Sequence, residues 1–538
     1  MKRALGKILC GATLLLGLPL TFTSCEEILG EWSKPAPVPG APNTPTPSPT
    51  PTPASKTAGA ISYATGSLAK GSQDPAFTNE LTITGDGTVS YSSSNEAVAT
   101  VDPNTGEVTP KGTGTVEITA TVSDSETYTY ETNTASYSLE VKDGYQYQEW
   151  DDVNKKFTTK YAATSAYQEL ADAASAAWDG TKTYVAKGNV TISGDVTVSA
   201  NSELILCDGA TLTISGKLKG EGGTKDLTIY AQSDGTKMGA LNATADMAAN
   251  GDNTIRFSNL TIHGGKISVT AKGSSYTDCE GICVVNALTM YGGDLTAQGN
   301  GNKGAGLQIQ TVALMNNAKL EAKGGDNNSG EGDDGISATS SGATISVSDN
   351  AILIATGGSS SGNNGGKAVC GPSVDPKTKV IASGNARVTL TGGKANSGTT
   401  TGGHGVSGNV TASGNASLEI TAGDGCLGGT GILYTLTISE NASVNVKGGN
   451  ATNASYSAGD AIDLVDYKGG SLTATGGVND SDANYNGKGI KTSITNNSAS
   501  DVDFEYGTDG SNWTTKQVAK TNTWSDATVN SLYIRTKP

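Results

Sequence analysis

The sequence predicts an all-β protein: a small β-sandwich, then a long right-handed parallel β-helix, with a short capping helix before the β-helix and a β-cap at the C-terminus. Three observations support this prediction. Glycine makes up 72 of 538 residues, about twice the usual share, without a Gly-X-Y period. Short runs of alternating apolar and polar residues are separated by turn residues throughout the chain. From about residue 187 the sequence repeats with a period of 25 to 35 residues.

Residues 1–24 have the three-part plan of an export signal. Three basic residues within the first seven positions precede an apolar run, Ile8–Leu20, that is too short to span a bilayer as a helix. Small residues follow, just before a cysteine. We therefore expect residues 1–24 to be removed on export.

The cysteine that follows this signal is Cys25, and the surrounding residues resemble the signal of bacterial lipoproteins. Phe22 departs from the strictest form of that motif. The resemblance implies cleavage before Cys25, acylation of this residue, and anchoring to outer-membrane lipid through it. Glu26 and Glu27 resemble a surface-export signal of some Gram-negative lipoproteins, so we expect the protein on the cell surface. Ordinary secretion is the alternative.

Residues 25–55 are expected to form a stalk, because the segment 34–53 is rich in proline and threonine. Such a segment cannot build a core and favours the extended polyproline II conformation. At about 3.1 Å per residue, these residues would hold the next domain roughly 60 Å from the membrane.

Residues 56–142 contain short alternating strands with Asp, Asn, Pro and Gly between them, which is typical of a sandwich. The clearest strands are Leu81–Ile83, Val98–Val101, Val116–Ala120 and Tyr137–Val141. The stretch from Tyr91 to Ala120 closely resembles the group 2 bacterial immunoglobulin-like domain. That resemblance implies an immunoglobulin-like sandwich that acts as a surface spacer, without a nucleophile, a base or a metal-binding set.

Residues 143–186 are predicted to be a junction that contains a helix over 164–178. Thr164 or Ser165 can cap the start of this helix, and Gly180 can end it. We expect the helix to cover the first turn of the repeat region; an interdomain linker helix is the alternative.

Three landmarks recur in a fixed order along the repeat region, residues 187–497. The first is a short apolar strand followed in most units by glycine, and it begins at Ile267, Leu295, Leu320, Leu353, Val388, Leu418, Val444 and Leu472. The second is an Asn-Ala pair, with its asparagine at Asn317, Asn350, Asn385, Asn415 and Asn441. The third is a glycine followed by an aliphatic residue, with its glycine at Gly281, Gly306, Gly335, Gly405, Gly431 and Gly489.

No single repeat unit could bury its own apolar face, so stacking must bury it, at about 4.8 Å per turn. The usual handedness of parallel crossovers makes the predicted β-helix right-handed. The Asn-Ala pairs fit either a left-handed turn residue or an amide ladder. Residues 498–538 break the pattern, and their aromatic residues suggest a small β-cap over the last open edge.

Charge and cysteine content exclude several kinds of partner and site. The net charge of −16 disfavours nucleic acid and anionic lipid. Five cysteines remain beyond the signal and Cys25, so a disulfide framework is not indicated. With only two histidines in the chain, a zinc site is not expected.

The steps Asp333-Asp334-Gly335 and Gly459-Asp460-Ala461 give the repeat region a loose resemblance to calcium-binding, carbohydrate-binding β-helix proteins related to polysaccharide lyases. The resemblance implies glycan binding, with calcium as a candidate cofactor. Hard oxygen ligands for calcium would come from Asp333 and Asp334, or from Asp460, Asp463 and Asp466. Solvated loop carboxylates are the alternative interpretation.

Catalysis is the rival hypothesis, because pectin-degrading β-helices use paired carboxylates with a Gly-His-Gly. Here Gly403-His404-Gly405 is 71 residues after Asp333, about two turns or roughly 10 Å along the axis. We interpret His404 as a turn residue. A lyase needs a basic residue beside calcium-binding carboxylates, and Arg387, two turns from Asp333, has no acidic partner group. We predict no catalytic residues.

The sequence therefore favours a cell-surface lipoprotein whose β-helix binds carbohydrate or extracellular matrix, with a polysaccharide or host glycoprotein as partner. A β-helical polysaccharide lyase or glycoside hydrolase is the first alternative, and a purely structural surface protein is the second. The low aromatic content counts against tight binding of glycans, because sugars stack on aromatic rings.

Overall fold

The computed structural model describes residues 55–273, 275–396, 398–496, 501–508, 514–518, 522–524 and 530–536. The predicted signal, Cys25 and the proline-rich stalk lie outside the described residues. Residues 56–538 belong to one compact unit. In the described residues every long element is a strand, which confirms the all-β prediction, and no helix is long and apolar enough to cross a membrane. Three single-turn 3-10 helices are η1 (Glu221–Gly223), η2 (Gly235–Lys237) and η3 (Ala483–Tyr485).

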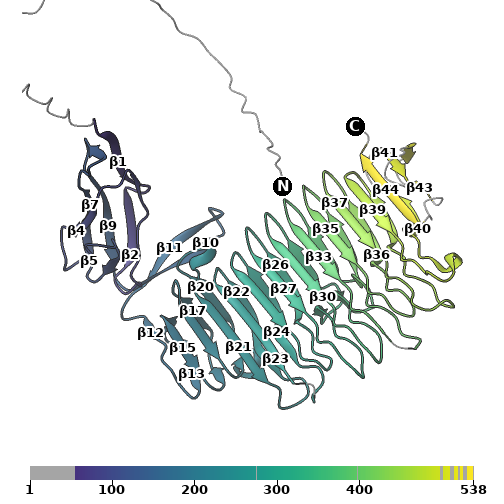
Figure 1. The fold of residues 1–538 in the computed structure, drawn as a ribbon. Coiled ribbons are helices and arrows are strands. Elements are labelled where there is room, and N and C mark those ends of the chain that lie inside the picture. The colour runs from purple at the N-terminus through teal and green to yellow at the C-terminus, as the bar shows by residue number, and fades with distance from the viewer. Residues whose placement is uncertain are drawn as a thin grey trace, which may run out of the picture. The chain divides into compact units, whose positions relative to one another are not determined.

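The N-terminal domain is an immunoglobulin-like sandwich (Figure 1). One sheet contains β3 (Leu81–Thr84), β1 (Thr57–Tyr63) and β8 (Tyr128–Tyr130). The other contains β2 (Ser67–Gly71), β9 (Thr134–Lys142), β7 (Gly114–Val122) and β4 (Val89–Ser93), and β5 (Ala99–Val101) pairs separately with β6 (Val108–Pro110). Alternate residues of β7 and β9 are buried, such as Ile118 and Leu139, so the period-2 pattern sets the core face. The four strands predicted for this domain are confirmed.

A hairpin of β10 (Tyr145–Asp151) and β11 (Lys156–Ala162) follows the sandwich. The predicted helix over 164–178 is wrong: this segment contains β12 (Tyr167–Glu169) and β13 (Ala176–Trp178). Both strands pair in parallel with strands of the next repeat, and Trp178 is buried against Tyr184, with ring centroids 4.7 Å apart. Pairing and burial against the next repeat outweigh the helix propensity of the alanines.

Two long, mostly parallel sheets make up the repeat region, and the chain passes alternately between them (Figure 1). We call one passage through both sheets a coil. The larger sheet has, in order, β12, β13, β14 (Thr183–Ala186), β16 (Val196–Val198), β17 (Ser202–Leu206), β19 (Leu218–Gly220), β20 (Leu227–Ala231), β22 (Asn253–Ile262), β24 (Glu280–Met290), β26 (Leu307–Leu314), β28 (Ile336–Ala338), β29 (Thr344–Val347), β31 (Val369–Cys370), β32 (Lys379–Ala382), β34 (Asn409–Ala412), β36 (Ile432–Ile438), β38 (Ile462–Tyr467), β40 (Ile490–Thr495) and β43 (Thr523–Trp524).

The smaller sheet receives one strand from each coil. Its parallel part contains β15 (Asn189–Ile192), β18 (Thr211–Ile214), β21 (Ala240–Asp246), β23 (Lys266–Lys272), β25 (Asp294–Gln298), β27 (Lys319–Lys323), β30 (Ile352–Thr356), β33 (Arg387–Thr391), β35 (Ser417–Thr421), β37 (Ser443–Lys447) and β39 (Ser471–Thr475). The residues of the first landmark pair with one another in register, as in Leu353 with Val388 and Val388 with Leu418. The predicted period is therefore the period of the coil.

Burial alternates along each of these strands. In β30, Leu353 and Ala355 are buried while Ile352 and Ile354 are half-buried. The inward residues of both sheets form one continuous apolar cluster from the first coil to the last. Each coil thus contributes two or three short strands and buries them against its neighbours.

The C-terminal strands break the parallel pattern, as the sequence predicts. β44 (Ser531–Thr536) pairs antiparallel with β39, the last strand of the smaller sheet. β43 pairs antiparallel with β40, the last coil strand of the larger sheet, and β41 (Val502–Gly507) with β42 (Thr514–Val518) completes the group. The C-terminal edges of both parallel stacks are therefore covered.

Candidate functional site

The third landmark places one side chain from each coil in a row along one corner. The backbone N–H of Gly335 donates to the carbonyl of Lys367 at 2.9 Å, and Ala368 N–H donates to the carbonyl of His404 at 3.1 Å. The same bond repeats on later coils. The residues that precede the landmark are therefore in register: Glu280, Ala305, Asp334, Lys367, His404, Thr430, Asp460 and Lys488. We call this row the corner ladder.

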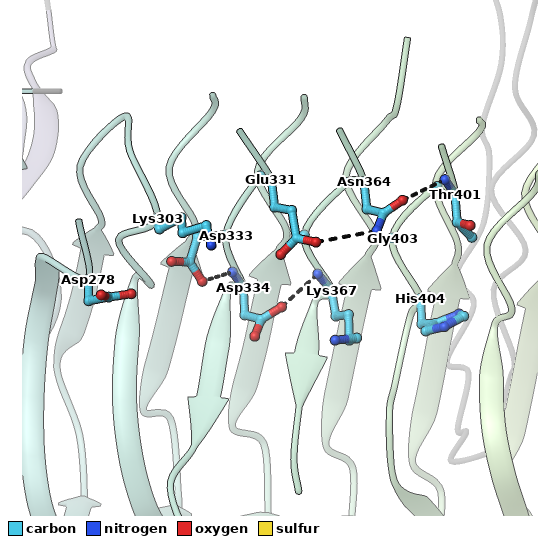
Figure 2. A pocket seen from close by; sticks show the side chains of 14 residues that line it. Asp278, Lys303, Glu331, Asp333, Asp334, Asn364, Lys367, Thr401, Gly403 and His404 are labelled. Carbon is cyan, nitrogen blue, oxygen red and sulfur yellow. Dashed lines mark hydrogen bonds between the residues drawn. The ribbon is translucent and has the colours of Figure 1, made fainter. Parts of the chain in front are cut away.

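A pocket of about 420 Å³ opens over the middle of the corner ladder (Figure 2). Asp334, Lys367 and His404 supply its ladder side chains. The other side chains that line it come from the loops of the same coils and of the coils before them: Asp278, Lys303, Glu331, Asp333, Asn364 and Thr401. Adjacent coils lie about 4.8 Å apart, so Asp334 and His404 are separated by roughly 10 Å along the stack.

Glycines form the wall between these side chains. A Cβ atom on Gly366 would lie 1.9 Å from the carbonyl oxygen of Asp333, and one on Gly403 would lie 1.8 Å from that of Gly366. Backbone therefore packs on backbone, and no other residue fits at these positions without movement. The pocket stays open because its loops contain no bulky side chain between the functional ones.

Two adjacent carboxyl groups, those of Asp333 and Asp334, occupy one end of the pocket. Both are half-buried. Burial and the charge of Asp334 raise the pKa of Asp333 to about 7, and burial also raises the pKa of Asp334. The Asp333 carboxylate accepts the N–H of Asp334 at 2.6 Å, and Asp334 accepts the N–H of Lys367 at 2.9 Å. Asp333 therefore exchanges its proton near neutral pH.

Lys367 lies one coil beyond Asp334 and remains charged. Although burial opposes it, the neighbouring Asp334 carboxylate raises the pKa of Lys367. The ammonium group donates to the Cys370 sulfur at 3.4 Å. Lys367 can thus offer a positive charge to a ligand, but a protonated lysine is not a base.

His404 occupies the far end of the pocket as a neutral side chain. Burial, with the charge of Lys367 as a second cause, lowers the pKa of His404 to about 4. The His404 Nδ1 atom accepts the N–H of Thr430 at 2.9 Å. In the neutral ring the proton is then on Nε2, so His404 can donate one hydrogen bond to a ligand.

The side-chain amide of Asn364 connects residues of neighbouring coils at the rim of the pocket. The Asn364 side chain donates to Glu331 at 3.4 Å and accepts the N–H of Thr401 at 2.8 Å (Figure 2). Four carboxyl groups and two ammonium groups face the pocket. This balance favours a neutral or cationic ligand with many hydroxyl or amino groups over a polyanion.

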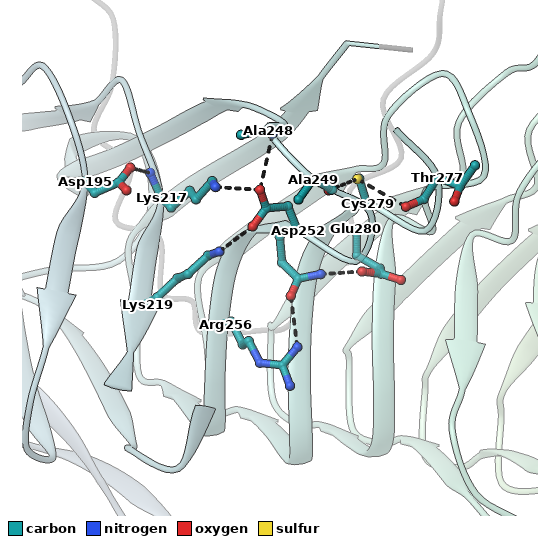
Figure 3. A network of polar contacts seen from close by, with 11 residues as sticks. Asp195, Lys217, Lys219, Ala248, Ala249, Asp252, Arg256, Thr277, Cys279 and Glu280 are labelled. Carbon is teal, nitrogen blue, oxygen red and sulfur yellow. Dashed lines mark hydrogen bonds and ion pairs between the residues drawn. The ribbon is translucent and has the colours of Figure 1, made fainter. Parts of the chain in front are cut away.

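A second polar network lies on the coils before the pocket (Figure 3). The ammonium groups of Lys217 and Lys219 both bind the Asp252 carboxylate, at 2.6 and 2.9 Å. Burial alone would raise the pKa of Asp252, but these bonds lower it. Asn253 donates to Glu280, which is buried and whose pKa burial raises to about 8. These groups bond to one another, so the network stabilises the coils and offers little to a ligand.

The structure brings together some of the predicted site residues and separates others. Asp333, Asp334 and His404 share the pocket, so the interpretation of His404 as a turn residue is incomplete. Asp460 lies four coils beyond Asp334 on the corner ladder and accepts the N–H of Lys488, while Asp463 accepts the hydroxyl of Thr492. The five carboxylates named as calcium ligands therefore lie on two separate coils, Asp333 and Asp334 on one and Asp460, Asp463 and Asp466 on the other. No group of three or more His, Cys, Asp or Glu that could hold a metal occurs among the described residues.

Sequence reasoning missed Lys367, one of the two cations of this pocket. The landmark was defined by glycine, whereas this coil has Ala368-Val369 in its place. Val369 pairs in register with Ile336 and Val406, the aliphatic residues of the neighbouring landmarks. An alignment of repeats that accepted alanine would have placed Lys367 between Asp334 and His404.

Comparison with known proteins gives one match. Residues 80–124 match the model of the immunoglobulin-like domain of intimin, which agrees with a bacterial immunoglobulin-like domain at this position. No curated protein and no solved structure matches the chain.

Proposed function

We propose that this chain is a lipid-anchored protein of a Gram-negative cell surface that binds carbohydrate through the corner-ladder pocket. The observation that carries the proposal is the pocket itself. Four acidic groups, two ammonium groups, an amide and a neutral imidazole converge on one open cavity of about 420 Å³ from several coils. Such a density of directional donors and acceptors suits a ligand with many hydroxyl groups.

The rest of the chain would present this pocket to the outside. The signal and Cys25 would supply the anchor, the proline-rich segment the stalk, and a group 2 immunoglobulin-like domain the spacer. The two parallel sheets would wind as a right-handed parallel β-helix, in line with the handedness of parallel crossovers. In this arrangement the repeat region faces extracellular glycan, either a polysaccharide or a host glycoprotein.

The charges in the pocket narrow the class of glycan. A uronic acid polymer would meet four carboxyl groups, so we expect neutral or amino sugars to bind more tightly. Calcium could reverse this preference by bridging carboxylates of the ligand and the protein. Calcium binding by Asp333, Asp334, Asp460 and Asp463 remains a prediction.

Glycoside hydrolysis is the second candidate. It is favoured by the Asp333 carboxyl, whose pKa of about 7 lies where a general acid works best, beside the second carboxyl of Asp334. A lyase is disfavoured, because Lys367 remains protonated.

The test uses the full-length chain in a detergent without a sugar headgroup. The protein is incubated with neutral glucans, mannan and chitin oligosaccharides, and with polygalacturonate and hyaluronan, in calcium and in chelator. Retention and new reducing or unsaturated ends are measured together. Asp334→Asn and His404→Ala are compared with Asp460→Asn, which changes the same ladder position outside the pocket.

Retention without products, weakened at least tenfold by the two pocket substitutions and not by Asp460→Asn, is the expected result. Products that disappear with Asp333→Asn would establish the hydrolase instead. Retention that is equal in all variants would place the ligand elsewhere and contradict the proposal.

A further inference from the structure

Aromatic side chains are scarce in this chain, yet several gather at one place. They lie where the β10–β11 hairpin packs on the first coils of the larger sheet. The cluster consists of Tyr147, Trp150, Phe157, Tyr230, Tyr291 and the imidazole of His263. None of these residues lines the corner-ladder pocket.

Three of the rings form a ladder of their own. Tyr230, His263 and Tyr291 occupy equivalent positions on successive coils, since the N–H of His263 donates to the carbonyl of Ile229 and that of Tyr291 donates to the carbonyl of Ile262, both at 2.8 Å. Their rings stack at 4.8 and 5.0 Å between centroids, with interplanar angles of 21° and 23°. Stacking along the coils therefore fixes a rigid aromatic wall.

The hairpin is bonded to this wall. The backbone N–H of Trp150 donates to Nδ1 of His263 at 2.9 Å. The Trp150 indole stacks on the ring of Tyr291, with ring centroids 5.8 Å apart and an interplanar angle of 20°. Asp152 accepts both the indole N–H, at 3.0 Å, and the Tyr291 hydroxyl, at 3.1 Å. The indole N–H, the Tyr291 hydroxyl and Nδ1 of His263 are thus paired within the protein, and the positions of these rings are set before any ligand arrives.

A cleft of about 990 Å³ opens beside these rings. Phe157 lies at its side, 37% exposed, with its ring edge-on to Trp150 at 5.3 Å. Gly292 lies directly beneath Phe157, since a Cβ atom at this position would lie 3.3 Å from the ring. Lys266, Asp294 and Asn317 add polar groups to the lining of the same cleft. One cleft therefore combines an exposed ring with charged and amide groups.

This combination identifies the class of ligand. The C–H face of a sugar packs on an aromatic ring, while its hydroxyl groups bond to amides and carboxylates around it. A lipid chain would leave the polar groups of the rim without partners. A nucleic acid would be repelled by the net charge of −16.

The cleft also continues into a row of exposed amides. Asn317 accepts a side-chain hydrogen bond from Asn350 at 3.4 Å, and Asn350 accepts one from Asn385 at 3.1 Å. The row goes on to Asn415 and Asn441. A chain of sugars that leaves the rings would meet further donors and acceptors at each coil.

We propose that this cleft is a second carbohydrate-binding site, in which a sugar ring stacks on Phe157 and Trp150 and its hydroxyl groups bond to Asn317. The site is independent of the corner-ladder pocket and does not rest on the function proposed for it.

Binding of cellohexaose, mannohexaose, xylohexaose and chitohexaose to the full-length chain tests the proposal, again in a detergent without a sugar headgroup. Calorimetry and tryptophan fluorescence report binding. Phe157→Ala and Asn317→Ala are compared with Tyr485→Ala, which removes a ring that is 40% exposed outside the cleft. Phe157→Trp retains an aromatic ring at this position, so it shows whether a loss of binding in Phe157→Ala comes from the missing ring or from misfolding.

At least one hexasaccharide should lose about tenfold in affinity with Phe157→Ala and keep its affinity with Phe157→Trp and Tyr485→Ala. Equal affinity of the wild type and Phe157→Ala for every hexasaccharide overturns the proposal. Lack of binding to all four hexasaccharides also overturns the proposal. So does a result in which none of them binds but a synthetic peptide of residues 34–53, the proline-rich segment of the predicted stalk, binds instead.

Discussion

At the scale of single residues, the charge states in the corner-ladder pocket depend on neighbours that are distant in sequence. Lys367 keeps its proton because Asp334 lies one coil away. His404 stays neutral because it is buried near Lys367. Asp333 changes its charge near neutral pH because it is half-buried beside a second carboxyl. The states of Lys367 and His404 follow from stacking, since 33 residues separate Asp334 from Lys367 and 37 separate Lys367 from His404, whereas the carboxyl beside Asp333 is its neighbour in sequence.

The raised pKa of Asp333 predicts that Asp333→Asn stabilises the protein at neutral and higher pH. Folding raises this pKa from 3.8 to about 7, so the folded state binds more protons than the unfolded state between these values. The contribution of Asp333 to stability therefore falls as pH rises from about 4 to 7. Because the group is partly exposed, we expect a gain of about 1–2 kcal/mol at pH 8 for the asparagine variant.

Urea denaturation at pH 3.5, 5.5 and 8 measures this effect. The gain should be near zero at the lowest pH and largest at the highest. A gain that is the same at all three values would mean that ionisation of Asp333 is not its cause.

At the scale of elements, the corner after five strands of the larger sheet, β26, β29, β32, β34 and β36, combines three features in a row. A residue with positive φ comes first, as in Asp349 at 59° and Gly384 at 65°. The ladder asparagine follows, and then a fully buried alanine. The sequence offered a left-handed turn or an amide ladder as alternatives, and the structure has both, at adjacent positions. The tight turn lets each amide lie over the next.

The amide ladder predicts that a central asparagine stabilises the stack more than a terminal one. Asn385 takes part in two side-chain amide bonds, to Asn350 and Asn415, whereas Asn441 takes part in one. We expect Asn385→Ala to lower the free energy of unfolding by about 1 kcal/mol and Asn441→Ala by about half of that.

Thermal and urea denaturation of the two variants measure the difference. Asn441 is a matched control, because it occupies the same turn position near the end of the row. Equal effects would show that the turn conformation, and not the amide bonds, makes asparagine favourable here.

At the scale of the whole molecule, a stack of parallel strands has open edges at its ends, and such edges pair readily with other chains. Here the last coil is covered by antiparallel strands, β44 on β39 and β43 on β40. The antiparallel direction interrupts the repeat, so a further coil cannot add in register. This cover is formed by a segment whose sequence has none of the three landmarks.

Removal of residues 501–538 is therefore expected to cause association of the chains. The truncated protein would expose the edges of β39 and β40, and we expect oligomers or aggregates in light scattering at concentrations where the full chain is monodisperse. As a control, a chain that ends at residue 536 keeps all four covering strands. A truncated protein that remains monomeric with an unchanged melting temperature would contradict the role of these strands.

The sequence by itself determined the all-β class, the immunoglobulin-like sandwich, the coil period and the residues that stack in each landmark. These features depend on local patterns, namely period-2 alternation, turn residues and repetition, which can be recognised in the sequence without the tertiary structure. The helix over 164–178 was mispredicted because alanine-rich segments favour a helix until strand pairing with the next coil outweighs that preference.

Only the tertiary structure decided which side chains share a site. Loops of unequal length separate the coils, so a fixed period does not place Lys367 between Asp334 and His404, and its coil lacks the glycine of the third landmark. Trp150, which the hairpin brings onto Tyr291, is likewise more than 130 residues distant from it in sequence. Stacking converts sequence separations of this size into contacts, because each coil returns the chain to within about 4.8 Å of the previous one.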